Sequence, residues 1–369
     1  MPIATAKYER LAGKMLEIYE DAERRMLQGV SRRLARGVEA NGWTERKYAE
    51  VSAARAEIEQ TLAGLRRQRT PLLKDILAET YGHGNKAFLT DAEKFGDFLG
   101  VSTLSPGSLK VARILSELQN TLDTGDRMIL RKANDAYADI IGRVSAQMAT
   151  GTTTVRQAVQ TAVNDFADRG IASFVDDAGR AWDMTTYAEM ATITAISNAT
   201  RAGYFDTMAA YGYDLAIVSA HAGACPLCVA WENVVLSVSG SSHEYPPVSE
   251  AEGAGLFHPR CLHHLSVYHE EIHTDARSKP REVEQPSYSY TARSRQRYYE
   301  RQVRQWKRRM AVATDTTTER YAYNHVRKWQ ARIREHLGQT SEVLPRKYYR
   351  EGGRQILQYN QRGVRRNVS

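Results

Sequence analysis

The sequence predicts an α+β fold with a mostly helical N-terminal domain over residues 1–150, a small α+β middle domain over residues 151–280 and a basic helical C-terminal arm over residues 281–369. The length, 369 residues, is typical of two or three domains. Apolar residues recur at spacings of three and four in the first and last parts, whereas short β-branched runs are confined to the middle. The charge is also uneven: the last part carries 21 Lys and Arg against 8 Asp and Glu, and the rest of the chain has a net charge of −5.

The N-terminal domain is predicted to open with a helical hairpin. Amphipathic patterns predict helices over residues 5–37, 45–69 and 71–81 and beyond residue 107. The breaks between them are predicted at Gly42, at Pro71 and at the pair Gly82 and Gly84, because these residues commonly end helices. We expect the apolar faces to form a core in preference to a surface for a partner protein.

The middle domain is predicted to start after a threonine-rich loop at residues 149–154. A capping box formed by Thr186 and Glu189 predicts a long helix that ends near Gly212. Beyond that glycine, short runs rich in apolar and β-branched residues predict strands over residues 215–218, 234–238 and 262–268.

The C-terminal arm is predicted to form two basic amphipathic helices after residue 287, with a break at residues 314–318 and a tail over residues 345–369. Its net charge of +13, together with nine Tyr and two Trp, suits contact with the phosphates and bases of DNA. The cations selected as candidate DNA contacts are Arg301, Arg304, Lys307, Arg308, Arg309, Arg327, Lys328, Arg332 and Arg334. A solvated basic face, or a basic surface that meets an acidic protein, stays open as an alternative.

The three cysteines of the chain predict a metal site. Cys225 and Cys228 form a CxxC pair, and Cys261 follows within the same 37-residue window, next to His258 and His263. Three cysteines and either histidine can build a tetrahedral site, and thiolate-rich sites favour zinc. A shell of four such ligands is closed, so we expect a structural role, in which the ion joins the strand before the CxxC pair to the strand after Cys261.

The cysteines also allow other interpretations. A thioredoxin-like redox pair fits poorly with a third cysteine, and a zinc deaminase would carry its histidine before the cysteine pair. Reduced thiols packed without a metal stay open. A metal-dependent hydrolase stays open as well, and it would need an open metal position beside a carboxylate such as Glu232, Glu244, Glu250 or Glu252.

Several unusual strings in a fixed order carry a family resemblance. They lie at residues 170–182, 187–190, 218–221 and 255–261, together with the CxxC pair. In these strings the chain resembles the phage minor capsid protein 2 family, which is similar in turn to the Mu F-like head morphogenesis proteins. One departure is Leu262, where the family usually has an arginine between the cysteine and the histidine.

The resemblance implies a tailed-phage virion component inside the capsid near the portal vertex, present in the host cytoplasm during assembly. The implied partners are the portal protein, a major capsid or scaffold protein and packaged double-stranded DNA bound without sequence preference. No enzymatic activity is implied, and no membrane or targeting segment is expected from the sequence. The alternatives are the metal-dependent hydrolase, acting in head maturation or DNA ejection, and a freestanding nucleic-acid-binding regulator, which would show a sequence preference.

Overall fold

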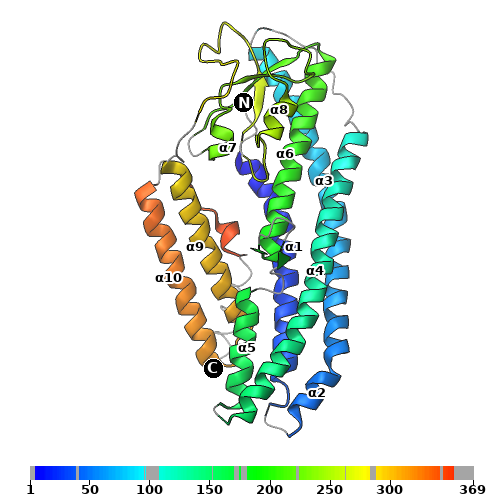
Figure 1. Cartoon of the computed structure of the whole chain (residues 1–369), viewed down its shortest axis with the longest axis vertical. Coiled ribbons are helices and arrows are strands. Elements are labelled where there is room, and N and C mark those ends of the chain that lie inside the picture. The colour runs from blue at the N-terminus through cyan, green and yellow to red at the C-terminus, as the bar shows by residue number, and fades with distance from the viewer. Residues whose placement is uncertain are drawn as a thin grey trace, which may run out of the picture. The chain divides into compact units, whose positions relative to one another are not determined.

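The computed structural model describes residues 5–38, 41–94, 96, 108–151, 153–169, 174–175, 181–221, 224–261, 263–282, 288–340 and 344–352. The described chain is mostly helical with small antiparallel sheets, as predicted (Figure 1). Its α-helices are α1 (Thr5–Ala35), α2 (Trp43–Ala49), α3 (Val51–Lys94), α4 (Ser108–Ala149), α5 (Val155–Arg169), α6 (Met184–Ala210), α7 (Pro226–Val229), α8 (Val248–Gly253), α9 (Tyr288–Ala311) and α10 (Thr316–Thr340). The strands are β1 (Phe174–Val175), β2 (Ala181–Trp182), β3 (Leu215–Val218), β4 (Val235–Ser237) and β5 (Leu265–Val267), and a 3-10 helix covers Tyr348–Glu351.

The residues group into two compact units, each made of three segments. The first unit comprises Met1–Met15, Thr70–Thr121 and Glu189–Ser294. The second unit comprises Leu16–Arg69, Leu122–Ala188 and Arg295–Ser369. The division at residues 150 and 280 that the sequence suggests stays a prediction.

The helix breaks predicted at Pro71, Gly82 and Gly84 are wrong, because α3 runs through all three positions. Gly84 lies inside the helix for a packing reason. A Cβ atom added there would lie 2.0 Å from the carbonyl oxygen of Thr200, so the glycine lets the backbones of α3 and α6 touch. Gly203 on α6 faces α3 in the same way.

Helix α6 begins slightly earlier than predicted. Asp183 precedes it and caps it: the carboxylate of Asp183 accepts hydrogen bonds from the amide of Thr186 at 2.7 Å and from the hydroxyl of Thr186 at 2.9 Å. The helix ends two residues before Gly212, whose positive φ of 77° suits a left-handed C-terminal cap.

The sheet of the first unit confirms the three predicted strands. The strand order is β4-β3-β5, and both pairs are antiparallel. Aromatic side chains of α3 and α6 pack against this sheet, with the Phe88 ring 5.6 Å from the Tyr204 ring. The Tyr204 hydroxyl accepts a hydrogen bond from the amide of Val267 in β5 at 2.8 Å and donates one to Asp91 at 3.1 Å. The helices and the sheet therefore share one core.

The carboxylate of Asp214 connects the beginning of β3 to the end of β4 and the residues that follow it. Asp214, next to β3, accepts hydrogen bonds from the Ser237 hydroxyl and the Ser239 amide, each at 2.6 Å. Partial burial raises the pKa of Asp214, but these hydrogen bonds outweigh burial and hold the pKa below its ordinary value.

The second unit contains a buried ion-pair cluster and the paired helices α9 and α10. Arg69 is 1% exposed and donates hydrogen bonds to Asp126 at 2.8 Å and to the Tyr19 hydroxyl at 2.7 Å. Helices α9 and α10 run side by side (Figure 1), and the Trp306 ring stacks on His325 at 3.8 Å. No helix among the described residues is both long and apolar enough to cross a membrane.

Candidate metal centre

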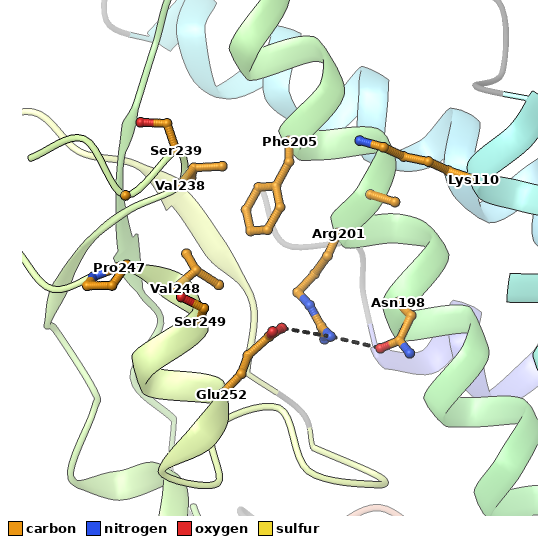
Figure 2. Close-up of a pocket in the computed structure, with 12 residues that line it drawn as sticks. Lys110, Asn198, Arg201, Phe205, Val238, Ser239, Pro247, Val248, Ser249 and Glu252 are labelled. Atoms are coloured by element: carbon orange, nitrogen blue, oxygen red, sulfur yellow. Dashed lines mark hydrogen bonds and ion pairs between the residues drawn. The ribbon is translucent and has the colours of Figure 1, made fainter. Parts of the chain in front are cut away.

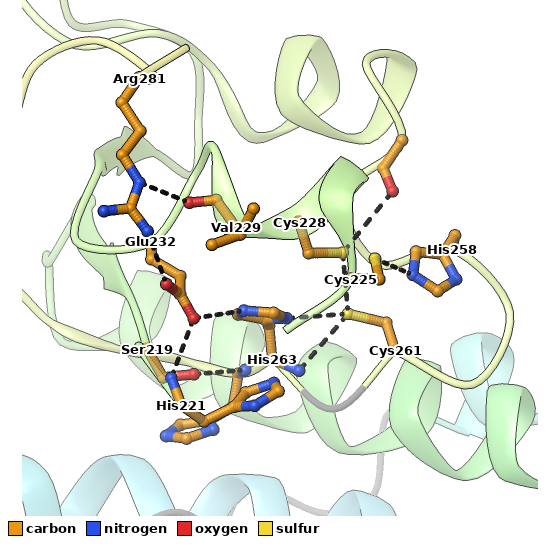
Figure 3. A network of polar contacts seen from close by, with 12 residues as sticks. Ser219, His221, Cys225, Cys228, Val229, Glu232, His258, Cys261, His263 and Arg281 are labelled. Carbon is orange, nitrogen blue, oxygen red and sulfur yellow. Dashed lines mark hydrogen bonds and ion pairs between the residues drawn. The ribbon is translucent and has the colours of Figure 1, made fainter. Parts of the chain in front are cut away.

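Two tight turns of the first unit present the predicted metal ligands. The first turn carries Cys225 and Cys228, and the amide of Cys228 donates a hydrogen bond to the carbonyl of Cys225 at 3.1 Å. Pro226 occupies the first position of the short helix α7, where its fixed φ suits helix initiation. The second turn carries His258 and Cys261, and the amide of Cys261 donates to the carbonyl of His258 at 2.9 Å. Figure 3 shows the two turns facing each other.

The five predicted ligand residues come together in this place. The Sγ of Cys225 lies 2.9 Å from Nε2 of His258, and the Sγ of Cys228 lies 3.5 Å from the Sγ of Cys261. The ligand atoms of Cys225, Cys228 and His258 lie within 4.8 Å of one another, and so do those of Cys228, Cys261 and His263. The three cysteines are free thiols, since a disulfide would need about 2.05 Å between two sulfurs.

The charges of the cluster favour a cation. A hydrogen bond from Cys228, and then one from His258, lowers the pKa of Cys225 to about 3. Hydrogen bonds from Cys228 and His263 lower the pKa of Cys261 to about 4. The pKa of Cys228 is raised, because its proton is shared with the two neighbouring sulfurs. A divalent ion that displaces the remaining thiol proton would meet three thiolate sulfurs.

The two histidines are held in different ways. His258 is half-buried, and its Nδ1 lies 2.9 Å from the carbonyl oxygen of Pro259. The hydrogen bond with Cys225 raises the pKa of His258. His263 is 3% exposed; burial would lower its pKa, but contacts with Cys261 and Glu232 outweigh burial and raise it.

A second layer of contacts lies behind His263. Its Nδ1 is 3.4 Å from the Sγ of Cys261, and its Nε2 is 3.3 Å from Oε1 of Glu232. Glu232 also accepts hydrogen bonds from the amide of His221 at 2.9 Å and from Arg281 at 3.3 Å (Figure 3). Sequence reasoning missed Arg281, because nothing in the sequence links it to a cluster whose nearest member, His263, lies 18 residues earlier.

The carboxylates named for the hydrolase alternative do not join the ligand groups within the described part of the chain. Glu232 contacts the cluster only through His263, and its oxygens already accept hydrogen bonds. Glu252 pairs with Arg201 at 3.7 Å, while Glu244 and Glu250 are exposed. The geometry therefore adds no support to a metal-bound water beside a carboxylate.

A groove of about 420 Å³ in the same unit is a second candidate site (Figure 2). Its floor is formed by α6, and its main cation, Arg201, donates to Asn198 at 2.7 Å and stacks 4.1 Å above the ring of Phe257. Lys110 at its rim forms an ion pair with Asp206. Because these charges are compensated by neighbouring groups of the protein, the groove offers no reactive arrangement.

Four of the nine candidate DNA contacts are engaged inside the second unit. Arg304 and Lys307 are 7% and 6% exposed and donate to backbone carbonyls near residue 350, and burial lowers the pKa of Lys307. Arg308 donates to the carbonyl of Ala167 at 2.9 Å, and Arg309 forms an ion pair with Asp168. These four cations hold α9 in place.

The other five candidates are exposed. They are Arg301 on α9 and Arg327, Lys328, Arg332 and Arg334 on α10. The guanidinium of Arg332 lies 5.6 Å from the Trp329 ring, and the opposite side of α10 is buried. Residues 353–369, which include most of the predicted tail, lie outside the described residues.

Comparison with known proteins gives two matches. The family model described as "Phage minor capsid protein 2" matches residues 3–338. A structural protein of Lactococcus phage LL-H is 28% identical over 190 residues, an alignment that covers 48% of this chain and 50% of that protein. The chain thus spans about half the length of this relative. No solved structure matches significantly.

Proposed function

Because the chain belongs to the phage minor capsid protein 2 family, we propose that it acts by binding and not by turnover, as an assembly component inside the phage head near the portal vertex. The family match over residues 3–338 is the observation that carries this proposal. The name of the Lactococcus phage relative, "Structural protein", agrees with a place in the virion. The proposed protein partners are the portal protein and a major capsid or scaffold protein.

Purified virions and procapsids test the assembly role. The protein is expected in both particles by quantitative mass spectrometry, and it is expected to co-purify with portal assemblies from lysates of infected cells. The major capsid protein is the internal standard for particle recovery. Absence of the chain from both particles would refute the proposal.

We further propose that the exposed side of α10 contacts packaged DNA. Arg320, Arg327 and Arg334 are exposed and seven residues apart, so they form one stripe with about 10.5 Å between successive cations. Lys328 and Arg332 are also exposed, and both lie to one side of this stripe. Apolar residues on the other side of α10 pack inward, so the cations are directed outward.

Salt-dependent binding to a random-sequence DNA duplex tests this contact. We expect affinity to fall steeply with salt and to be indifferent to sequence. The double variant R327Q/K328Q should lower the slope of log K against log salt by roughly 0.9 per lost phosphate contact. R131Q/K132Q is the matched control, because it removes the same charge from two adjacent exposed residues of α4. Equal slopes for the two variants would refute a contact through α10.

We also propose that the cysteine and histidine cluster binds one structural Zn²⁺. The first turn follows β3 and the second precedes β5, so an ion between the turns would join neighbouring strands of the sheet. The thiolate-rich donor set and the two lowered cysteine pKa values support zinc over magnesium or calcium. A closed shell gives the ion a structural role.

Elemental analysis of the purified chain tests the metal. One zinc per chain is expected, and a strong chelator should lower the melting temperature. The double variant C225S/C228S should bind no zinc, and its melting temperature should not respond to the chelator. A wild-type chain that lacks zinc after purification in its presence, or that melts at the same temperature with and without chelator, would refute the proposal.

A further inference from the structure

The cluster holds five ligand candidates, one more than a tetrahedral ion accepts. Building on the proposed zinc centre, we propose that His258 is the fourth ligand, and that His263 is a positioning residue that holds the sulfur of Cys261 against Glu232. The two histidines differ in their position relative to the second turn. They also differ in the partner of the ring nitrogen that does not face a cysteine: this partner is the Pro259 carbonyl for His258 and Glu232 for His263.

The first argument is the likeness of the two turns. In each turn the ligands are three residues apart, and the amide of the second ligand donates to the carbonyl of the first, at 3.1 Å in Cys225–Cys228 and 2.9 Å in His258–Cys261. Such a turn directs both side chains to the same side. Arg260 adopts a positive φ of 69° to close the second turn. His263 lies outside this repeat, two residues beyond Cys261.

The second argument is the ring nitrogen left for the metal. Nδ1 of His258 lies 2.9 Å from the carbonyl of Pro259, which fixes the proton on Nδ1 and leaves Nε2 as the ligand atom. That Nε2 lies 2.9 Å from the Sγ of Cys225, in the direction of the other sulfurs (Figure 3). Without the ion this nitrogen and the Cys225 sulfur share a hydrogen bond, and once the ion displaces that proton Nε2 offers its lone pair to the metal.

The third argument is that His263 is engaged at both nitrogens by anionic groups. One nitrogen faces the Sγ of Cys261 at 3.4 Å and the other faces Glu232 at 3.3 Å. The amide of His263 also donates to the same sulfur, at 3.4 Å. Because both the ring and the amide of His263 approach the one sulfur of Cys261, His263 is placed to stabilise that ligand from behind.

The contacts of His263 connect the proposed ligands to residues outside the two turns. Glu232 accepts a hydrogen bond from Arg281 at 3.3 Å, and Arg281 also donates to the carbonyl of Val229 in the first turn, at 3.3 Å. The contacts form a closed path from Cys261 through His263, Glu232 and Arg281 back to α7. Loading of the ion should therefore strengthen the contacts of Arg281 with Glu232 and Val229.

Co²⁺ bound in place of zinc to the full chain distinguishes the two histidines. The wild-type chain should show the tetrahedral absorption bands of three sulfurs and one nitrogen. His258→Cys should change these to the bands of four sulfurs while keeping one Co²⁺ per chain. His263→Cys should leave the band positions as in wild type. Cysteine can still act as a ligand, so these exchanges keep the centre able to form.

Affinity measurements complete the test. His263→Gln and Glu232→Gln should each weaken Co²⁺ binding by about 10- to 100-fold without moving the bands, as expected for groups behind the ligands. Bands that move in His263→Cys, or that stay in place in His258→Cys, would overturn the assignment. A wild-type chain that takes up no Co²⁺ would instead refute the zinc centre itself, so the two failures are distinguishable.

Discussion

Replacement of Gly84 by alanine should destabilise the first unit, although alanine is the better helix former. A Cβ atom at this position would lie 2.0 Å from the carbonyl oxygen of Thr200 and 2.7 Å from the amide nitrogen of Tyr204. Both atoms belong to the backbone of α6, so no side-chain rotation relieves the contact. The helices must separate by about 1.4 Å to restore ordinary van der Waals contact.

The magnitude follows from two opposing terms. Overpacking of a well-packed core costs about 1–3 kcal/mol, and a backbone clash of this depth lies at the upper end. The helix propensity of alanine offsets about 1 kcal/mol of that cost. Gly84→Ala should therefore lower the free energy of unfolding by about 2 kcal/mol. Gly82→Ala, one half-turn earlier with no atom within 4 Å of its added Cβ, should raise it by up to about 1 kcal/mol.

Urea denaturation followed by circular dichroism compares the two variants directly. Gly203→Ala, whose Cβ would lie 2.1 Å from the carbonyl of Tyr81, should behave like Gly84→Ala. Because one separation of the helices relieves both clashes, the double variant should lose less stability than the sum of the single variants. Equal stability of Gly84→Ala and Gly82→Ala would show that α3 and α6 do not touch at this point.

Three further changes have defined outcomes. Arg69→Met leaves Asp126 buried without its main partner, so the free energy of unfolding should fall by about 3–5 kcal/mol in denaturant titrations; a loss below about 1 kcal/mol would contradict a buried pair. The lowered pKa of Asp214 stabilises the fold at pH values above the pKa of this group in the unfolded chain, and the contribution is lost as pH falls through the folded pKa. Asp214→Asn should therefore lower the free energy of unfolding by about 1 kcal/mol at pH 7, and the difference from wild type should shrink in acid. A difference that does not change with pH would contradict this role. Arg260→Met removes the ion-pair partner of the buried Glu189 carboxylate, so it should lower the melting temperature of the wild-type chain. The same substitution should lower the melting temperature less in a Glu189→Gln background. Equal losses in the two backgrounds would exclude the ion pair.

Periodicity predicted most of the elements but missed how the long helices meet. The strands at residues 215–218, 234–238 and 262–268 are bounded by turn residues, so their pattern locates β3, β4 and β5. The sequence around Gly84 is the same whether this glycine ends a helix or allows a second helix to approach closely. The difference lies in Thr200, which is more than a hundred residues away and carries no signal of the contact.

The residues of the candidate metal centre were predictable from the sequence, but the different roles of its two histidines and of Glu232 were not. The CxxC spacing and the following His and Cys are local patterns whose meaning depends on side-chain chemistry alone. How His258 is turned toward the cysteines depends on turn geometry, to which the positive φ of Arg260 contributes. The role of Glu232 depends on His263 being buried beside it. Such distinctions arise only when the chain is folded.

The charge of the C-terminal arm shows why composition overstates a binding surface. The net charge of +13 over residues 281–369 counts every cation equally. In the folded chain Arg304 and Lys307 donate hydrogen bonds to backbone carbonyls near residue 350, and Arg309 is paired with Asp168, so these cations stabilise the unit. Only cations whose helix face is exposed can release counterions from DNA. A salt slope measured for the whole chain should therefore be smaller than the full excess of positive charge would give.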